Sequence, residues 1–291
     1  MAAEAPIAAR PAPSRVPGSR IRPSMILVYG LLILASIGFV LPFYWMVVSS
    51  LRPAADFYKI PIPLVPDPPS VENFQALFER SMFGRGIANT VFLAIVSVIL
   101  QVWFCALAGY TFAKLRFAGR DRLFVGVLAT MMIPLGVGMI PNFIIMARIH
   151  WVDTFLPLIV PGIANAFGVF WMRQYCLSLP DDLLDAARVD GTGEFGIFTR
   201  IVLPIIRPAL ASLSIFVFLS TWNDFLQPLV FLRSQENFTV QLWLSFVSRV
   251  NNVGQPAIVM AGSVLASIPI VIMFALLQRH FIAGLTAGSN K

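Results

Sequence analysis

Apolar residues gather in six long stretches of the chain, and shorter polar segments separate them. The stretches run from Met25 to Ser50, Ile87 to Phe112, Leu123 to Ala147, Phe155 to Tyr175, Ala209 to Phe231, and Ala257 to Gln278. Each has close to the ~20 residues with which a helix crosses the hydrocarbon core of a bilayer. The pattern predicts an all-α membrane protein with six transmembrane helices in residues 25–291.

Composition strengthens this prediction. The chain is 58% hydrophobic and only 12% charged, whereas soluble domains carry about 25% charged residues. A net charge of +7 would suggest a nucleic-acid partner in a soluble protein, but here the arginines flank the apolar stretches. Cys105 and Cys176 lie in and at the end of apolar runs, so we expect packing roles and no disulfide framework.

The distribution of basic residues predicts an orientation. Residues 1–24 are basic and rich in proline, which is typical of a disordered tail. With this tail inside, the inner segments hold 14 of the 21 arginines and lysines, and the outer segments hold 7. Because inner loops carry the excess of basic residues, both termini are predicted to be cytoplasmic.

The segment between the fourth and fifth stretches, residues 180–204, is predicted to form a helix–glycine–helix hairpin. Pro180 and two following aspartates are typical of a helix start, and Gly191 is a natural left-handed stop. Ala186 and Ala187 on the first helix would let another backbone approach closely. On these grounds alone the hairpin is either a socket for a cytosolic protein or an amphipathic element packed under its own bundle.

The residues of this hairpin resemble the EAA loop of ABC importer permeases. The spacing Asp-Ala-Ala-x3-Gly-x9-Ile-x-Leu-Pro is met by Asp185, Ala186, Ala187, Gly191, Ile201, Leu203 and Pro204, with Arg188 and Asp190 between them. Asp185 stands where the family usually has glutamate, which shortens the reach of the carboxylate by one methylene. The resemblance implies that the first helix is a coupling helix that docks in a groove of an ATPase subunit.

Two further stretches are similar to sugar importer permeases of the MalG type. They are Trp222 to Leu229, and the C-terminal tail with Gly284, Leu285, Thr286, Ala287 and Gly288. The resemblance implies a type I importer permease in the bacterial plasma membrane, with the tail contacting the ATPase. It also implies three partners, namely a second, non-identical permease, a cytoplasmic ATPase dimer and an extracytoplasmic sugar-binding protein.

The chain lacks the Gly-Lys-Ser/Thr sequence of a nucleotide-binding P-loop. ATP and Mg²⁺ are therefore expected on the partner ATPase, and we expect no catalytic residue, cofactor or metal site here. Asp224 is the one acid inside a predicted span. With Asn223 it either lines the translocation path or serves the structure, by pairing with an arginine or capping a break near Pro228. Gln101, Asn142 and Asn165 are expected to form interhelical hydrogen bonds.

Other functions stay open at this point. A secondary transporter driven by an ion gradient would need titratable residues at the membrane midplane, and only Asp224 qualifies. A structural scaffold would have no use for the hairpin. The sequence predicts a permease subunit that moves a carbohydrate into the cytoplasm, with glycerol-3-phosphate as an alternative substrate, and it does not name the sugar.

Overall fold

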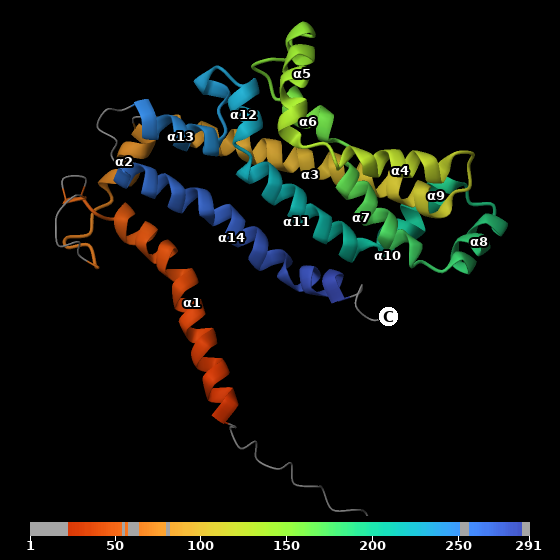
Figure 1. Ribbon diagram of the computed structural model, residues 1–291, viewed down its shortest axis with the longest axis horizontal. Coiled ribbons are helices and arrows are strands. Elements are labelled where there is room, and N and C mark those ends of the chain that lie inside the picture. The colour runs from red at the N-terminus through yellow and green to blue at the C-terminus, as the bar shows by residue number, and fades with distance from the viewer. Residues whose placement is uncertain (1–22, 54–55, 58–63, 80–81, 251–255, 287–291) are drawn as a thin grey trace, which may run out of the picture. The chain divides into compact units, whose positions relative to one another are not determined.

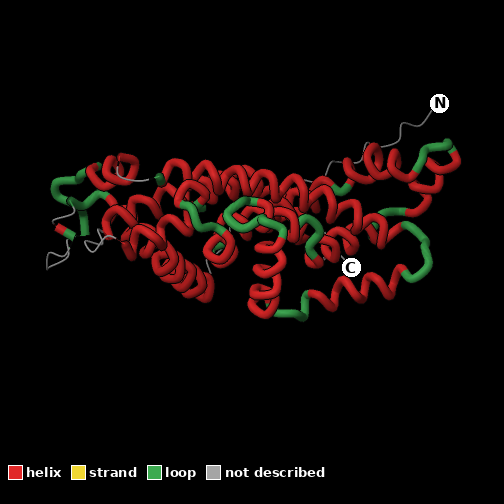
Figure 2. Tube along the Cα trace, turned by 90° about the horizontal axis from the view of Figure 1, so that it is seen from above, coloured by secondary structure: helices red, strands yellow, loops and turns green. Residues whose placement is uncertain are grey.

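The computed structural model describes residues 23–53, 56–57, 64–79, 82–250 and 256–286. In these residues the secondary structure consists of helices joined by loops, without strands (Figures 1 and 2). The chain divides into two compact units, Met1–Trp45 and Met46–Lys291, and each is described by itself. Of the tail expected over residues 1–24, residues 1–22 lie outside the described residues, and Pro23 already belongs to the first helix, α1.

Helix α1 (Pro23–Ser50) is apolar on all sides over most of its length. Its side chains from Met25 to Tyr44 are all exposed in the structure. A helix that is hydrophobic all round belongs in an apolar environment rather than in water. The predicted span from Met25 to Ser50 is therefore present as one continuous helix, long enough and apolar enough to cross a membrane.

The core of the second unit is built on α3 (Phe83–Lys114), α7 (Ala166–Leu177) and α11 (Arg207–Asn223). Helices α3 and α7 approach so closely that a Cβ on Gly109 would lie 2.5 Å from the Cβ of Met172. A Cβ on Gly168 would lie 2.6 Å from the sulfur of Cys105. Small residues allow such contacts between membrane helices. Cys105 and Cys176 are buried and form no disulfide, in agreement with the predicted packing roles.

A second cluster joins α11 to α14 (Pro256–Thr286), α13 (Val240–Val250) and the short α2 (Glu72–Glu79). The indole of Trp222 is fully buried, and its Nε1 donates a hydrogen bond to the carbonyl of Ala266, 3.1 Å away. A Cβ on Gly262 would lie 2.6 Å from Leu244 Cδ2, so α13 and α14 also pack tightly. Figure 1 shows α14 beside α11.

The third apolar stretch does not form the single helix that the sequence predicted over Leu123 to Ala147. It forms α4 (Arg120–Thr130) and α5 (Leu135–Arg148), which meet at a break that includes Pro134. Proline has no amide hydrogen and restricts the residue before it, so helices end there. Figure 1 shows α5 leaving the direction of α4 at this break.

The fourth and fifth stretches are also interrupted. The fourth consists of α6 (Leu156–Ile159), the 3-10 turn η2 (Val160–Gly162) and α7. In the fifth, α11 ends at Asn223 and α12 (Leu226–Phe231) follows. Among the described residues, four helical segments are long and apolar enough to cross a membrane, and Leu156–Leu177, taken as one segment, is among them. The number is five if Glu194–Ile205 and Arg207–Asn223, which are bent by 81°, count as a single span.

Candidate functional site

The predicted helix–glycine–helix hairpin is confirmed. Helix α8 (Asp181–Val189) begins directly after Pro180, with Asp181 and Asp182 in its first turn. Gly191 follows the helix with a φ of +79°, which is the left-handed conformation expected of a helix stop. The amide of Thr192 then donates to the carbonyl of Ala187 at 3.0 Å, which closes the end of the helix.

The return half of the hairpin differs from the prediction. It consists of α9 (Glu194–Ile197), the π-helix η3 (Phe198–Val202) and α10 (Leu203–Ile205). Pro204 lies inside α10, and the 81° bend into α11 falls at Ile206. The π-helix explains this tolerance, because it widens the turn in which the proline ring would otherwise clash with the carbonyl of Arg200.

The two faces of α8 have different surroundings. Leu184 and Ala187 are buried against the bundle. Leu183 and Ala186 are exposed, and the side chain of Val189 is 87% exposed. Ala186 and Ala187 were expected on one accessible surface. They do not share a surface, because Ala187 packs inward. The exposed apolar face of α8 is formed by Leu183, Ala186 and Val189, of which Leu183 and Val189 were missed.

The side chains of Ile201 and Leu203 are half-buried and pack against the core. These contacts hold the return half of the hairpin against the bundle. Pro204 and Asp190 are exposed. Phe195 is 64% exposed, whereas Ile197, Phe198 and Val202 are buried.

A network of charged groups ties the hairpin to α3. The guanidinium of Arg188 donates to the carboxylates of Glu194, at 2.7 Å, and of Asp185, at 2.6 Å. The hydroxyl of Tyr110, on α3, donates to the other oxygen of Glu194 at 2.7 Å. Both acids raise the pKa of Arg188, Glu194 more than Asp185. The short side chain of Asp185 thus reaches a partner in its own helix, Arg188.

A second attachment lies at the start of α8. Lys114, the last residue of α3, donates from Nζ to the carbonyl of Leu179 and to the carboxylate of Asp181, both at 2.6 Å. Its ammonium group is almost completely covered, and it lowers the pKa of Asp181. The hairpin is therefore fixed to the end of α3 at two points, by Lys114 and by Tyr110.

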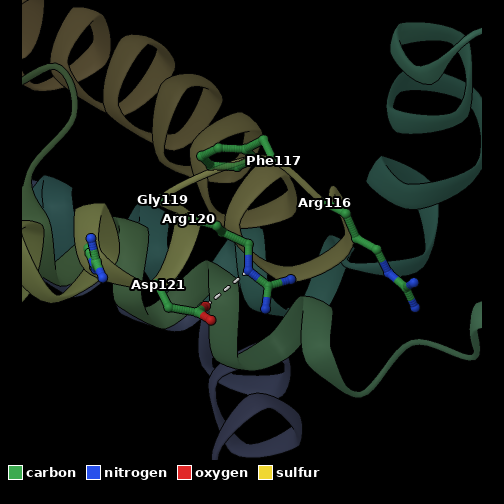
Figure 3. A pocket seen from close by; sticks show the side chains of 6 residues that line it. Arg116, Phe117, Gly119, Arg120 and Asp121 are labelled. Atoms are coloured by element: carbon green, nitrogen blue, oxygen red, sulfur yellow. Dashed lines mark hydrogen bonds and ion pairs between the residues drawn. The ribbon is translucent and has the colours of Figure 1, made fainter.

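The loop that follows Lys114 is basic (Figure 3). Arg116, Arg120 and Arg122 line an open groove of about 520 Å³ with Phe117, Gly119 and Asp121. Arg120 Nε bonds to the carboxylate of Asp121 at 3.0 Å, whereas Arg116 extends away from this pair. Because Lys114 also holds α8, the basic loop and the hairpin lie at the same end of the bundle.

The loops near the other end of α3 are held by Asp153. Asp153 has a left-handed backbone, with φ of +64°, and its carboxylate accepts hydrogen bonds from the amides of Arg233 and Ser234 and from the hydroxyl of Ser234. The side-chain amide of Asn237 donates to its carbonyl at 2.8 Å. Partial burial alone would raise the pKa of Asp153, but these bonds lower it to about 2. No motif in the sequence predicts this cluster, because Asp153 and Ser234 lie 81 positions apart.

The two candidates for the translocation path lie at the break after α11. Asn223 is exposed, and its amide donates to the carbonyl of Leu219 at 2.9 Å. Asp224 is half-buried, and its carboxylate accepts the amide of Gln227 at 3.3 Å at the start of α12. This contact agrees with the capping interpretation. Among the described residues no arginine or lysine forms an ion pair with Asp224.

The remaining polar predictions have mixed outcomes. Asn165 donates to Gln101 at 2.7 Å across α7 and α3, so the interhelical hydrogen bond is confirmed for these two residues. No such bond is described for Asn142, for which the prediction stays open. Gly284, Leu285 and Thr286 form the last residues of α14, and Ala287 and Gly288 lie outside the described residues.

Comparison with known proteins adds to this geometry. Residues 105–286 match the model of the family described as "Binding-protein-dependent transport system inner membrane component". The chain belongs to this family. It is therefore a multi-pass membrane permease rather than an enzyme, and a binding protein is one partner of its transport system.

Two relatives of this permease match nearly their whole length. The "Arabinooligosaccharides transport system permease protein AraQ" of Halalkalibacterium halodurans is 40% identical over 273 residues, with 92% of this chain and 96% of the relative covered. The "Lactose transport system permease protein LacG" of Rhizobium radiobacter is 32% identical, with 91% and 96% covered. These identities extend over α1 and over the hairpin.

A solved structure shares the fold. A chain of a bacterial ABC transporter involved in the import of the acidic polysaccharide alginate superposes with a TM-score of 0.83. The match covers 92% of this permease and 100% of that chain, at 24% sequence identity. At this identity the likeness shows the fold alone.

Proposed function

We propose that this permease is one subunit of an ATP-driven importer that carries a carbohydrate into the bacterial cytoplasm. Its relatives are named for transport of arabinooligosaccharides, lactose and maltodextrin. The observation that carries the proposal is the hairpin of α8 to α10, which is fixed to α3 through Arg188 and Lys114 and presents an exposed apolar face. A surface of this kind suits a partner that pushes on the bundle.

The ATPase docks on α8. Leu183, Ala186 and Val189 form an apolar strip flanked by Asp182 and Asp190, so a partner groove can bury the strip while its polar rim meets the acids. Arg188 and Glu194 carry the movement of α8 to Tyr110 on α3. The ATPase dimer binds ATP and Mg²⁺, and the C-terminal residues 284–288 make a second contact with it.

The topology follows from the charges. The hairpin end, with Arg116, Arg120 and Arg122, lies in the cytoplasm, as the excess of basic residues favours. Six apolar stretches cross the membrane, three of them as interrupted helices, and both termini lie in the cytoplasm of the cell. Interrupted helices are tolerated at membrane depth where they are buried in protein or line a water-filled cavity.

One six-span chain offers one docking hairpin, whereas a two-subunit ATPase needs two. A second, non-identical permease supplies the other hairpin and the other wall of the pore. The extracytoplasmic binding protein delivers the sugar to the end where Asp153 holds the loops. Asn223 and Asp224 lie beside the path that the sugar then follows.

Uptake by the reconstituted complex tests the function. The permease pair, ATPase and binding protein are placed in proteoliposomes, and radiolabelled arabinooligosaccharide, lactose or maltodextrin is added outside. We expect uptake of at least one of these sugars that requires internal ATP. Uptake that persists without ATP and follows an imposed ion gradient would instead establish a secondary transporter.

A further inference from the structure

One face of α11 combines an aromatic ring with polar side chains. Phe216, Ser220 and Asn223 stand at positions i, i+4 and i+7, so they follow one another along the same side of the helix. All three are exposed in the structure, with 37% of Phe216 accessible. The buried face of α11, which includes Leu213 and Val217, packs into the core instead.

Two aromatic residues of α7 extend this face. Phe167 and Trp171 are one helical turn apart, and both contact the ring of Phe216, with centroids 5.6 and 5.9 Å away. The ring of Phe167 is 38% exposed. The indole Nε1 of Trp171 is buried and has no hydrogen-bond partner among the described residues, so Trp171 contributes its ring rather than its N–H to this face. We call Phe167, Trp171, Phe216, Ser220 and Asn223 the aromatic shelf.

The shelf lies between two interruptions of membrane helices. Helix α7 starts at Ala166, directly after η2 and the capping residue Asn165, so Phe167 stands in its first turn. Helix α11 ends at Asn223, and the chain is extended at Asp224 before α12 begins. Transporters place substrate sites at such interruptions, where freed backbone groups line a cavity.

The polar groups of the shelf are only partly used. Ser220 donates to the carbonyl of Val217 at 2.9 Å, and Asn223 donates one N–H to the carbonyl of Leu219. Among the described residues, the side-chain oxygen of Asn223 accepts no hydrogen bond, and both side chains are exposed. An amide turned towards hydrocarbon is costly. The exposed residues Val271, Ile272 and Phe274 on α14 are, by contrast, apolar and suit lipid.

We propose that the aromatic shelf contacts the carbohydrate during its passage through the permease. This inference rests on the proposed function and names the residues that touch the sugar. The C–H faces of a sugar ring pack on the exposed rings of Phe167 and Phe216. Its hydroxyls exchange hydrogen bonds with the exposed side chains of Ser220 and Asn223.

Transport rates separate this role from a structural one. The binding protein captures the sugar first, so a lost contact in the permease lowers the maximal rate of uptake more than the apparent KM. Loss of one aromatic contact should slow uptake by roughly three- to tenfold in Phe216→Leu, which keeps apolar volume. Phe216→Tyr keeps the ring and should therefore transport faster than Phe216→Leu. Phe274→Leu, on the lipid-like face of α14, is the matched control.

Thiol labelling tests whether the shelf faces an aqueous path. Cys105 and Cys176 are buried, so the wild-type chain should react slowly. Ser220→Cys in the complete complex should react with a charged, water-soluble methanethiosulfonate, and Phe274→Cys should not. The transported sugar, together with binding protein and ATP, should slow the reaction at position 220.

The outcomes are distinguishable. If the wild-type complex takes up none of the sugars in the presence of ATP, the proposed function itself fails. If wild-type uptake is normal but Phe216→Leu transports like Phe274→Leu, the shelf does not contact the sugar. Ser220→Cys that stays unreactive in the complex would also overturn the inference, because the face is then covered by lipid or by the second permease.

Discussion

The two ends of the bundle are both held by charged side chains, but in opposite ways. At the hairpin end, Arg188 bridges Asp185 and Glu194 across a glycine turn, while the apolar residue Val189 stays 87% exposed beside them. At the other end, the carboxylate of Asp153 is saturated by hydrogen bonds from the loop after α12. The first arrangement presents a surface and connects it to α3, whereas the second only closes loops. The proposed ATPase contact needs an exposed surface that is connected to α3, and the hairpin end has one.

The largest expected effect comes from Gly191→Val. Its Cβ would meet nothing within 4 Å, so the whole penalty is the left-handed backbone, with φ of +79°. A cost of ~1–2 kcal/mol for an L-residue in this conformation lowers the ratio of closed to open hairpins about tenfold. We expect uptake and sugar-stimulated ATPase activity in proteoliposomes to fall by up to this factor.

Gly193 provides the control for this change. It also has open space around it, but its φ is −66°, which suits any residue. Gly193→Ala should therefore transport normally. If Gly191→Val performs as well as Gly193→Ala, the shape of the turn does not matter for coupling.

Arg188→Ala should have the next largest effect. It removes the bridge from α8 to Glu194 and Tyr110, so among the described polar contacts Lys114 alone still attaches α8 to α3, and α8 follows α3 less closely. Because the guanidinium is about one-third exposed, each pair contributes less than ~1 kcal/mol, and we expect uptake per ATP hydrolysed to fall by roughly threefold. Arg200→Ala changes an exposed arginine of the same hairpin. An equal loss in both variants would contradict a specific bridge.

The Asp153 cluster should affect stability rather than coupling. Its folded pKa is about 2, below the ordinary value of 3.8. Its stabilisation is therefore present above pH ~4 and is lost as the pH falls towards 2. After allowance for solvent screening we expect about 1 kcal/mol. Thermal unfolding in detergent at pH 7 should show Asp153→Ala less stable than wild type.

Asp153→Asn is the informative companion to Asp153→Ala. Asparagine tolerates the left-handed backbone and can still accept hydrogen bonds, so it should lose less stability than alanine. Both variants should keep the wild-type ratio of uptake to ATP hydrolysis. A changed ratio would show that the Asp153 end also affects coupling, and not stability alone.

Deletion of residues 284–291 should have the smallest effect on folding, because the six apolar stretches end by Gln278. We expect normal expression with a lower rate of sugar-stimulated ATP hydrolysis. Rates of ATP hydrolysis and uptake equal to those of the full-length chain, measured at matched expression, would show that the tail is dispensable.

The sequence was most informative where local chemistry dominates. Pro180, the paired aspartates and Gly191 specify a helix and its stop, and the structure has both. Apolar length likewise located the membrane helices. It did not locate their breaks at Met131 to Pro134 and at Asp224, because hydropathy reports burial and not helix continuity. Prolines alone were ambiguous, since Pro204 lies inside a helix after a π-turn.

Contacts between distant segments could not be predicted. Tyr110 and Glu194 are 84 positions apart, and Asp153 and Ser234 are 81 apart. Their pairing depends on how α3, α7 and α11 pack, which is set by glycines such as Gly109 at close contacts. The inward turn of Ala187 has the same origin, because the side of α8 that meets the bundle is decided by Leu184 and its neighbours.

Site-specific photo-crosslinking at Val189 tests directly whether the ATPase docks on α8. A photoreactive amino acid replaces Val189 on the exposed face of α8, or Glu236, which is exposed at the other end, in the assembled importer. We expect an adduct with the ATPase from position 189 whose yield changes on addition of ATP, and none from position 236. If position 189 yields no ATPase adduct, or if both positions yield equal adducts, α8 is not the docking surface of the ATPase.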